Sequence, residues 1–69
     1  MQKVYTKIES IVGNVVTVKA EGVRLGDLAL VGDSYATVIK LDRDIVSLQV
    51  FAGAQGVGTN DSVRFLDRP

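Results

Sequence analysis

The glycine-rich segment over residues 53–59 has the composition closest to that of a binding loop. It places glycine at 53, 56 and 58 and ends on Thr59. A phosphate loop of the Gly-x-x-x-x-Gly-Lys-Ser/Thr type needs its lysine and a following helix, because the lysine and the backbone N–H groups surround the phosphates. No lysine follows the last glycine here, and the next segment alternates like a strand. We therefore interpret residues 53–59 as an irregular loop.

Carboxylates at turn positions raise the question of a calcium site. Five aspartates fall in expected turns and loops: Asp27, Asp33, Asp42, Asp44 and Asp61. A calcium loop requires oxygen ligands at alternate positions, a central glycine and a terminal glutamate. Asp42 and Asp44 have the spacing but enclose Arg43, and nothing after them continues the pattern. Since aspartate often bonds to its own backbone in turns, we interpret these residues as turn formers.

Acid–base catalysis has few candidates in this chain. Glu9 and Glu21 are able in principle to act as an acid and a base, but the sequence has no His and no Cys to complete a nucleophile–base set. The same absence excludes disulfides and thiolate metal sites. We therefore expect no catalytic, cofactor-binding or metal-binding residues in the chain, and no enzyme activity for it alone.

A nucleic-acid interface is the alternative that the residue types leave open. Oligonucleotide-binding barrels interleave basic and aromatic side chains so that bases stack on the rings. The candidates here are Arg24, Lys40, Arg64 and Arg68 with Tyr35, Phe51 and Phe65. Eight basic and eight acidic residues give a formal net charge of zero, however. Nucleic-acid backbones select clustered Lys and Arg, and a net charge of zero argues against such a cluster. A small nucleic-acid-binding or translation-factor-like barrel is therefore the second hypothesis and not the first.

Short strands are the elements that must position all these residues, because the pattern alternates and helical spacing is missing. Strands are expected over residues 4–11, 16–20, 28–31, 35–41, 45–51 and 62–66. Gly13-Asn14, Gly32-Asp33 and residues 42–44 are expected to be tight turns. The side chains expected to face inward are Val16, Val18, Ala20, Val46, Leu48 and Val50, with Phe51 outward or at a rim.

A weak internal repeat relates the two halves of the chain. Residues 15–20 match residues 45–50 at an offset of 30, and residues 8–11 match 38–41 at the same offset. After four extra residues, Gly22-Val23 matches Gly56-Val57, and Asp27 matches Asp61, at an offset of 34. Two copies are fewer than a solenoid needs, so each half is expected to complete the other around a pseudo-twofold axis.

These patterns predict one all-β domain over residues 1–69. Six short strands with regular turn signals favour a small closed six-stranded β-barrel, because closure removes exposed strand edges. A barrel of this size is filled by side chains and leaves no room for a ligand. No apolar run approaches the roughly 18 residues of a membrane span, and the N-terminus lacks a signal-peptide pattern. We expect a cytoplasmic domain without direct membrane contact.

The sequence as a whole resembles the N-terminal barrel of the B subunit (beta chain) of bacterial V-type ATP synthases. The residues that carry the resemblance are Tyr5 to Ile8, Ala20 to Gly26, Ser34 to Ala36, Leu48 to Phe51 with Gly53 and Gly56, and Val63 to Leu66 closing on Arg68-Pro69. The turn at Gly32-Asp33 is shorter than the family usually carries.

The resemblance implies a structural role in a rotary ATPase engaged in ATP-linked transport of protons or other ions. In such an enzyme the barrels form a crown on the ring of alternating A and B subunits, and the B barrel docks the peripheral stalk. ATP or ADP binds in the nucleotide domain of the full-length subunit, which would begin near Pro69, so the chain is expected to be an excised or designed domain. Tyr5, Tyr35 and Phe51 are the expected outward contacts, and the isolated domain is expected to self-associate.

Overall fold

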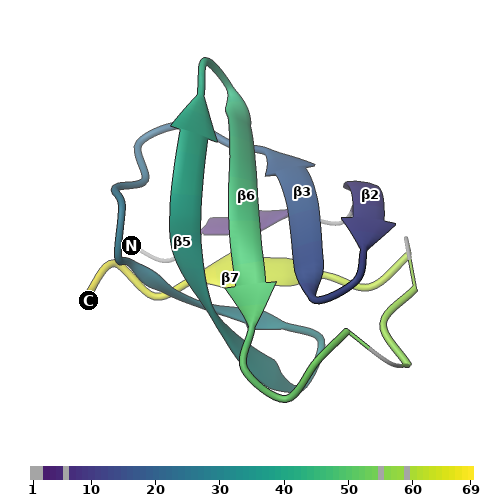
Figure 1. The fold of residues 1–69 in the computed structure, drawn as a ribbon. Coiled ribbons are helices and arrows are strands. Elements are labelled where there is room, and N and C mark those ends of the chain that lie inside the picture. The colour runs from purple at the N-terminus through teal and green to yellow at the C-terminus, as the bar shows by residue number, and fades with distance from the viewer. Residues whose placement is uncertain (1–2, 6, 55, 59) are drawn as a thin grey trace.

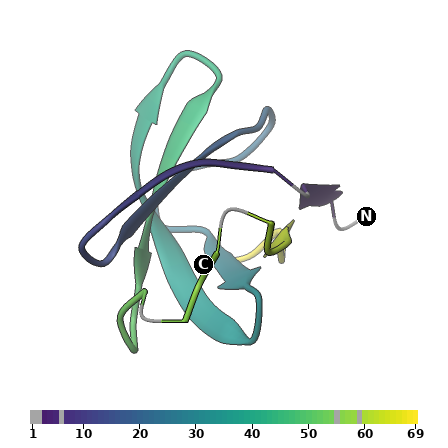
Figure 2. The same ribbon diagram turned by 90° about the vertical axis from the view of Figure 1, so that its right-hand side faces the viewer.

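Seven antiparallel strands make up the fold. The computed structural model describes residues 3–5, 7–54, 56–58 and 60–69, and only the backbone of residues 3–5. The strands are β1 (Lys3–Tyr5), β2 (Ile8–Val12), β3 (Val15–Lys19), β4 (Leu28–Val31), β5 (Ser34–Asp42), β6 (Ile45–Val50) and β7 (Val63–Phe65). They form one sheet in the order β1-β7-β4-β5-β6-β3-β2, which curls strongly (Figures 1 and 2). The predicted all-β class is confirmed.

The first expected strand is present as two strands, β1 and β2, so six expected segments contribute seven ladder strands. Tyr5 pairs with Val63, and Ile8 pairs with Val18. In the other half, the corresponding positions on β5 are Ala36 and Val38, which are only two residues apart. The first half therefore holds one extra residue at this point, which interrupts the strand, whereas β5 runs unbroken for 9 residues.

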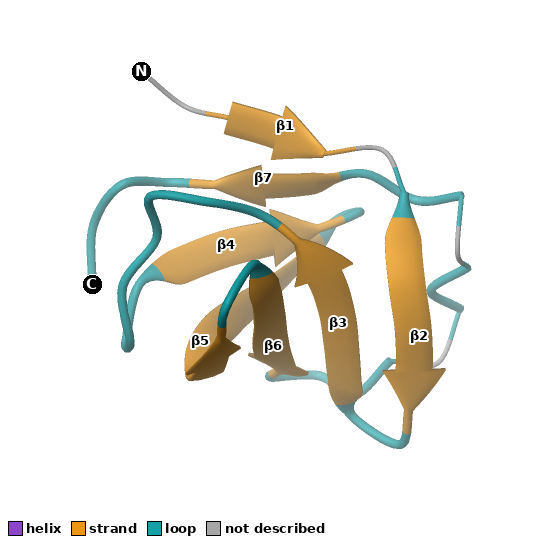
Figure 3. Cartoon of the chain, turned by 90° about the horizontal axis from the view of Figure 1, so that it is seen from above, coloured by secondary structure: helices purple, strands orange, loops and turns teal. Residues whose placement is uncertain are grey.

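The two edges of the sheet are consecutive in the chain. β1 pairs only with β7 and β2 only with β3 in the described ladders, and the short connection between β1 and β2 joins them covalently (Figure 3). Because one continuous segment supplies both edges, the curled sheet has the connectivity that a small barrel requires.

Small and β-branched side chains fill the interior. All six residues predicted to face inward are buried, and the opposite strands add Ala29, Val31, Ala36, Val38, Val63 and Phe65. β-Branched side chains suit a strongly curved, pleated surface. Phe65 and Leu48 are the largest of the fully buried side chains, so much of the interior packing depends on them.

The predicted pseudo-twofold axis is present in the strand register. β3 and β6 pair with Thr17 opposite Ser47, and these two residues are themselves equivalent at the offset of 30. β4 and β7 pair with Leu30 opposite Arg64, which are equivalent at the offset of 34. A residue lies opposite its own equivalent only where a twofold axis passes between the two strands. The axis therefore crosses the molecule through both strand pairs.

Irregular features obey the same symmetry. The register shifts between Ile8 and Ser10 on β2, and between Val38 and Lys40 on β5. Ala20 N donates to Asp44 O at 2.8 Å, and the equivalent Val50 N donates to Asn14 O at 2.9 Å. Since β-bulges are specific structural features, their repetition supports a true structural duplication.

The two equivalent hairpin turns differ in one residue type. Gly13 and Arg43 both have φ of 59°, a left-handed conformation that costs an L-residue about 1–2 kcal/mol. We expect Arg43→Gly to raise the free energy of unfolding by about 0.5 kcal/mol, after the entropic cost of glycine, and Gly13→Ala to lower it by about 1 kcal/mol. Urea denaturation measures both changes; a destabilised Arg43→Gly would show that the arginine side chain stabilises the turn.

Candidate interaction surface

The glycine-rich loop directs its described N–H groups into its own turns. Gly53 N donates to Val50 O, Val57 N donates to Ala54 O, and Gly58 N donates to Asp61 Oδ2 at 2.9 Å. A phosphate cradle needs such groups aimed at the ligand and a helix behind them. Here the loop leads to β7, as predicted, and residues 55 and 59 lie outside the described part of the chain.

The candidate calcium ligands lie in turns, and the β4–β5 turn that carries Asp33 adjoins Asp61, since a Cβ on Gly32 would lie 3.7 Å from Asp61 Cγ. Arg24 N donates to Asp27 Oδ2 at 3.0 Å, which repeats the bond from Gly58 N to Asp61 at the equivalent position. Asp42 and Asp44 lie at the β5–β6 hairpin instead. Among the described residues, no group of three or more Asp, Glu, His or Cys is placed to hold a metal ion. The bonds of Asp27 and Asp61 support the prediction that they are turn formers.

The two candidate acid–base residues lie on different elements. Glu9 is exposed at the bulge of β2, and Glu21 is exposed in the loop that follows β3. Both side chains face solvent, where a carboxylate lacks the enclosed surroundings that usually tune an acid or base for catalysis.

The expected base-stacking platform is divided over the molecule, and one of its members is unsuitable. Phe65 is buried at 1% exposure, so its ring cannot stack on a base, and this candidate was wrong. The alternation of β7 explains the error, since Val63 and Phe65 face inward while Arg64 faces outward. The four basic candidates are exposed but come from four different elements: Arg24 from the loop between β3 and β4, Lys40 from β5, Arg64 from β7 and Arg68 from the segment after β7.

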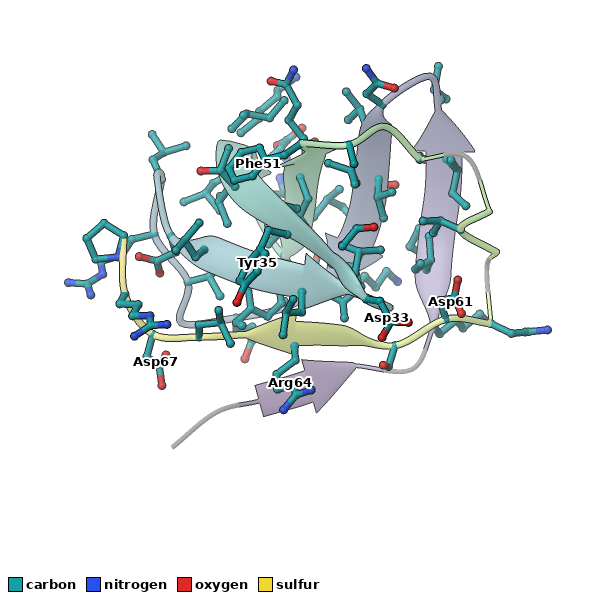
Figure 4. All side chains as sticks on the ribbon, turned by 90° about the horizontal axis from the view of Figure 1, so that it is seen from below. Asp33, Tyr35, Phe51, Asp61, Arg64 and Asp67 are labelled. Carbon is teal, nitrogen blue, oxygen red and sulfur yellow. The ribbon has the colours of Figure 1, made fainter. Side chains whose placement is uncertain are left out.

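An outer aromatic patch, defined here as Leu30, Tyr35 and Phe51, remains on the outside of the sheet. Leu30 pairs with Tyr35, and Phe51 N donates to Tyr35 O at 3.0 Å, which places the two aromatic residues side by side. Figure 4 shows Tyr35 between Phe51 and Arg64. Both rings are more than half exposed, so their predicted outward orientation is confirmed. The side chain of Tyr5, the third expected contact, lies outside the described residues.

A second apolar surface, which we call the open end, lies near the β5–β6 hairpin. It consists of Leu25, Ile39 and Leu41, which are 64%, 44% and 40% exposed. Gly26 N donates to Val38 O at 2.9 Å, and Val38 N donates to Asp27 O at 2.9 Å. These bonds hold the loop that carries Leu25 against the part of β5 that carries Ile39. The sequence reasoning missed this surface, although the shorter loop of the first repeat was a signal for it.

The fold agrees with a comparison to known families. Residues 8–67 match the family model described as the ATP synthase alpha/beta family, beta-barrel domain. The chain belongs to this family. The resemblance inferred from the sequence is therefore confirmed, and so is the barrel architecture that it implied.

V-type ATP synthase beta chains are among the relatives of this barrel domain. It is 61% identical to the beta chain of Treponema denticola over 99% of its own length, and 58% identical to that of Borrelia turicatae over 100%. The beta chain of Chlamydia pneumoniae is 51% identical over 100%. In each case the domain covers 17% of the relative's length. A search of the described residues for a helix able to cross a membrane finds none.

Proposed function

We propose that this barrel is an assembly domain of a rotary V-type ATP synthase beta chain. In this role it contributes to the crown of the ring of alternating A and B subunits and to attachment of the peripheral stalk. The barrel is the N-terminal domain of a longer subunit, and residues 1–69 form that single domain. The parent complex couples ATP synthesis or hydrolysis to transport of protons or other ions, and this domain lies on its cytoplasmic side.

The observation that carries the proposal is the amount of apolar side chain left exposed on a well-packed barrel. Six large hydrophobic residues are exposed within the described part of the chain. Five of them form two clusters, Tyr35 with Phe51 and Leu25 with Ile39 and Leu41, whereas Val12 stands alone at the β2–β3 turn. Exposed apolar clusters on small domains often mark protein interfaces. The beta-chain relatives supply the matching context, since a barrel that makes up 17% of such a subunit would meet its neighbours in the assembly.

Nucleotide chemistry belongs, in this proposal, to other parts of the full-length subunit. The described residues of the glycine-rich loop bond within their own turns, so we assign the domain no cofactor of its own. ATP or ADP would bind downstream, and the isolated barrel would have no hydrolytic activity. When the ring is missing, the exposed apolar residues favour weak self-association of the barrel.

Assembly of the ring tests the proposal. A V-type beta chain (B subunit) carrying this barrel is mixed with the A subunit. A second beta chain that lacks residues 1–69 is mixed with the A subunit in the same way. Native mass spectrometry counts the subunits in each complex. We expect the intact chain to form the alternating ring and the truncated chain to remain in smaller species. A ring of normal size and stability without the barrel would contradict the assembly role.

The nucleic-acid alternative is tested separately with the 69-residue barrel. The side-by-side Tyr35 and Phe51, with Arg64 two strands away from Tyr35 in the sheet, are the observation that favours it, although the net charge is zero. Binding to a phosphate backbone strengthens as salt is lowered. We expect no binding of single-stranded RNA at micromolar concentration and low salt; saturable binding that Tyr35→Ala abolishes would favour the alternative.

A further inference from the structure

The two ends of the barrel are related by the pseudo-twofold axis but are covered differently. Ala20 corresponds to Val50, and Gly22 corresponds to Gly56. Between these points the first half has only Glu21, whereas the second half has residues 51–55. Both stretches follow equivalent strands, β3 and β6. The four extra residues therefore lie at one end of the barrel and have no counterpart at the other.

The longer loop covers its end with apolar side chains. Val50 N donates to Asn14 O, and a Cβ on Gly53 would lie 3.3 Å from Asn14 Oδ1, so the loop lies directly against the β2–β3 hairpin. Ala54, one of the extra residues, is buried. Val57 packs against the core, as its counterpart Val23 does at the other end, so Ala54 is the part of this cover that has no counterpart. Ile11, at the same end, is also packed against the core. At this end the chain itself supplies a buried apolar residue over the interior.

The equivalent end lacks that cover. Leu41 is the counterpart of Ile11 at the offset of 30, and it is 40% exposed where Ile11 packs against the core. Ile39, the counterpart of Glu9, places a β-branched side chain where the first half has a carboxylate. Leu25 adds a third exposed aliphatic group from the adjoining loop. The open end thus exposes Leu41 where the other end has the packed Ile11, and it exposes Ile39 where the other end has Glu9.

We propose that a short apolar loop of a neighbouring ring subunit covers the open end. It would occupy the place that the loop around Ala54 occupies at the other end, and so complete the apolar packing over Leu41. This inference rests on the proposed assembly function. The symmetry indicates the shape of this covering loop. The strands at the two ends are equivalent, and at one end the loop around Ala54 shows what covers them.

The charges around the open end favour a protein over a polyanion. Residues 20–27 and 40–44 carry six exposed charged side chains, three basic and three acidic: Arg24, Lys40, Arg43, Glu21, Asp42 and Asp44. Nucleic acids and anionic membranes select surfaces with an excess of positive charge. The balanced charge here suits another protein surface with mixed charges.

The size of the open end favours a partner that is already held nearby. Three partly exposed side chains offer much less than the roughly 800 Å² per partner that a stable independent interface buries. Such a surface contributes usefully only when other contacts keep the partner in place, because linked contacts act at high effective concentration. A neighbouring subunit of one ring meets this condition.

Replacing the aliphatic groups tests the contact without disturbing the core. The variant Leu25→Ser with Leu41→Ser is introduced into the full-length beta chain, with Val12→Ser as the matched control. Val12 is exposed at the opposite hairpin and is the counterpart of Asp42. We expect the double variant to need about tenfold more subunit for half-maximal ring assembly, since about 1.4 kcal/mol of apolar contact corresponds to that factor. The control should assemble like the wild type.

A loop graft tests the same contact in the opposite direction. Glu21 is replaced by the five residues Phe-Ala-Gly-Ala-Gln of positions 51–55, which gives the open end the chain's own cover. We expect the isolated grafted barrel to melt about 2–4 °C higher and the grafted beta chain to assemble at least tenfold less well, because the neighbour's place is filled.

The outcomes separate this inference from the assembly function itself. If the beta chain without residues 1–69 forms normal rings, the assembly function fails and the open end has no role in it. If the barrel is required but the serine variant assembles at wild-type concentration, only the open-end contact is overturned. A serine variant that forms the ring poorly while its isolated barrel melts within 3 °C of the wild type supports the contact.

Discussion

Phe65→Ala is expected to remove most of the stability of the isolated barrel at 25 °C. Phe65 is 1% exposed and is the largest of the fully buried side chains. It lies on β7 between Lys3 of β1 and Ala29 of β4, and the small side chain of Ala29 cannot expand to fill a cavity. Removing a buried phenylalanine costs about 3–5 kcal/mol. A domain of this length has a total stability of only about 3–10 kcal/mol, so most of the margin is lost.

Urea denaturation followed by circular dichroism measures this effect, with Val31→Ala as the matched control. Val31 is the pseudo-twofold counterpart of Phe65 and is equally buried. The control removes fewer atoms, and we expect it to cost about 1–2 kcal/mol and to remain folded. A loss of less than about 1.5 kcal/mol for Phe65→Ala would show that the interior around β7 collapses easily, contrary to a tightly filled barrel.

Asp27→Ala is expected to destabilise the barrel more than the equivalent change Asp61→Ala. Each carboxylate accepts a bond from a backbone N–H three residues earlier, at 3.0 and 2.9 Å. Asp27 is buried at 5% exposure, whereas the Asp61 bond is exposed to solvent. Loss of Asp27 therefore leaves the Arg24 N–H without its acceptor in a partly buried site, which costs about 1.5–3 kcal/mol. Water replaces the lost partner near Asp61, so that change costs about 0.5–1 kcal/mol.

The two free energies of unfolding, measured under identical conditions, decide this prediction. The pair is a matched comparison because position, bond geometry and surrounding turn are related by the internal symmetry. Equal losses for the two variants would mean that burial does not govern the contribution of these turns. A larger loss for Asp61→Ala would place the structurally important turn in the glycine-rich loop instead.

The strand pattern, the two halves and most of the interior were predictable from the sequence. Alternation placed Val16, Val18, Val46 and Leu48 inside, because neighbouring strand residues face opposite sides of a sheet. The repeat predicted that Gly13 and Arg43 occupy equivalent turns, which their φ angles confirm. The offsets of 30 and 34 between matched residues were enough to predict the symmetry. The strand register shows the same offsets, with Thr17 opposite Ser47 and Leu30 opposite Arg64.

Features that depend on coverage by another segment were not predictable in the same way. The base-stacking hypothesis selected Phe65 by residue type, although the alternation of Val63, Arg64 and Phe65 places its ring on the side opposite to the charged Arg64. The division between β1 and β2 follows from one additional residue before Ile8, which alternation could not locate. Strict alternation places Leu41 on the same side as the exposed Tyr35, and only the register shift between Val38 and Lys40 sets it opposite the buried Val46.

Hydrogen–deuterium exchange of the barrel, free and within the assembled ring, tests the central claim most directly. If the domain serves assembly through its apolar surfaces, amide exchange should slow in the ring at residues 24–26 and 38–42, where the open end meets its neighbour. The β2–β3 turn at residues 12–15, which the chain's own loop already adjoins, should exchange at nearly the same rate in both states. Identical exchange over the whole barrel in the free and assembled states would contradict the assembly role.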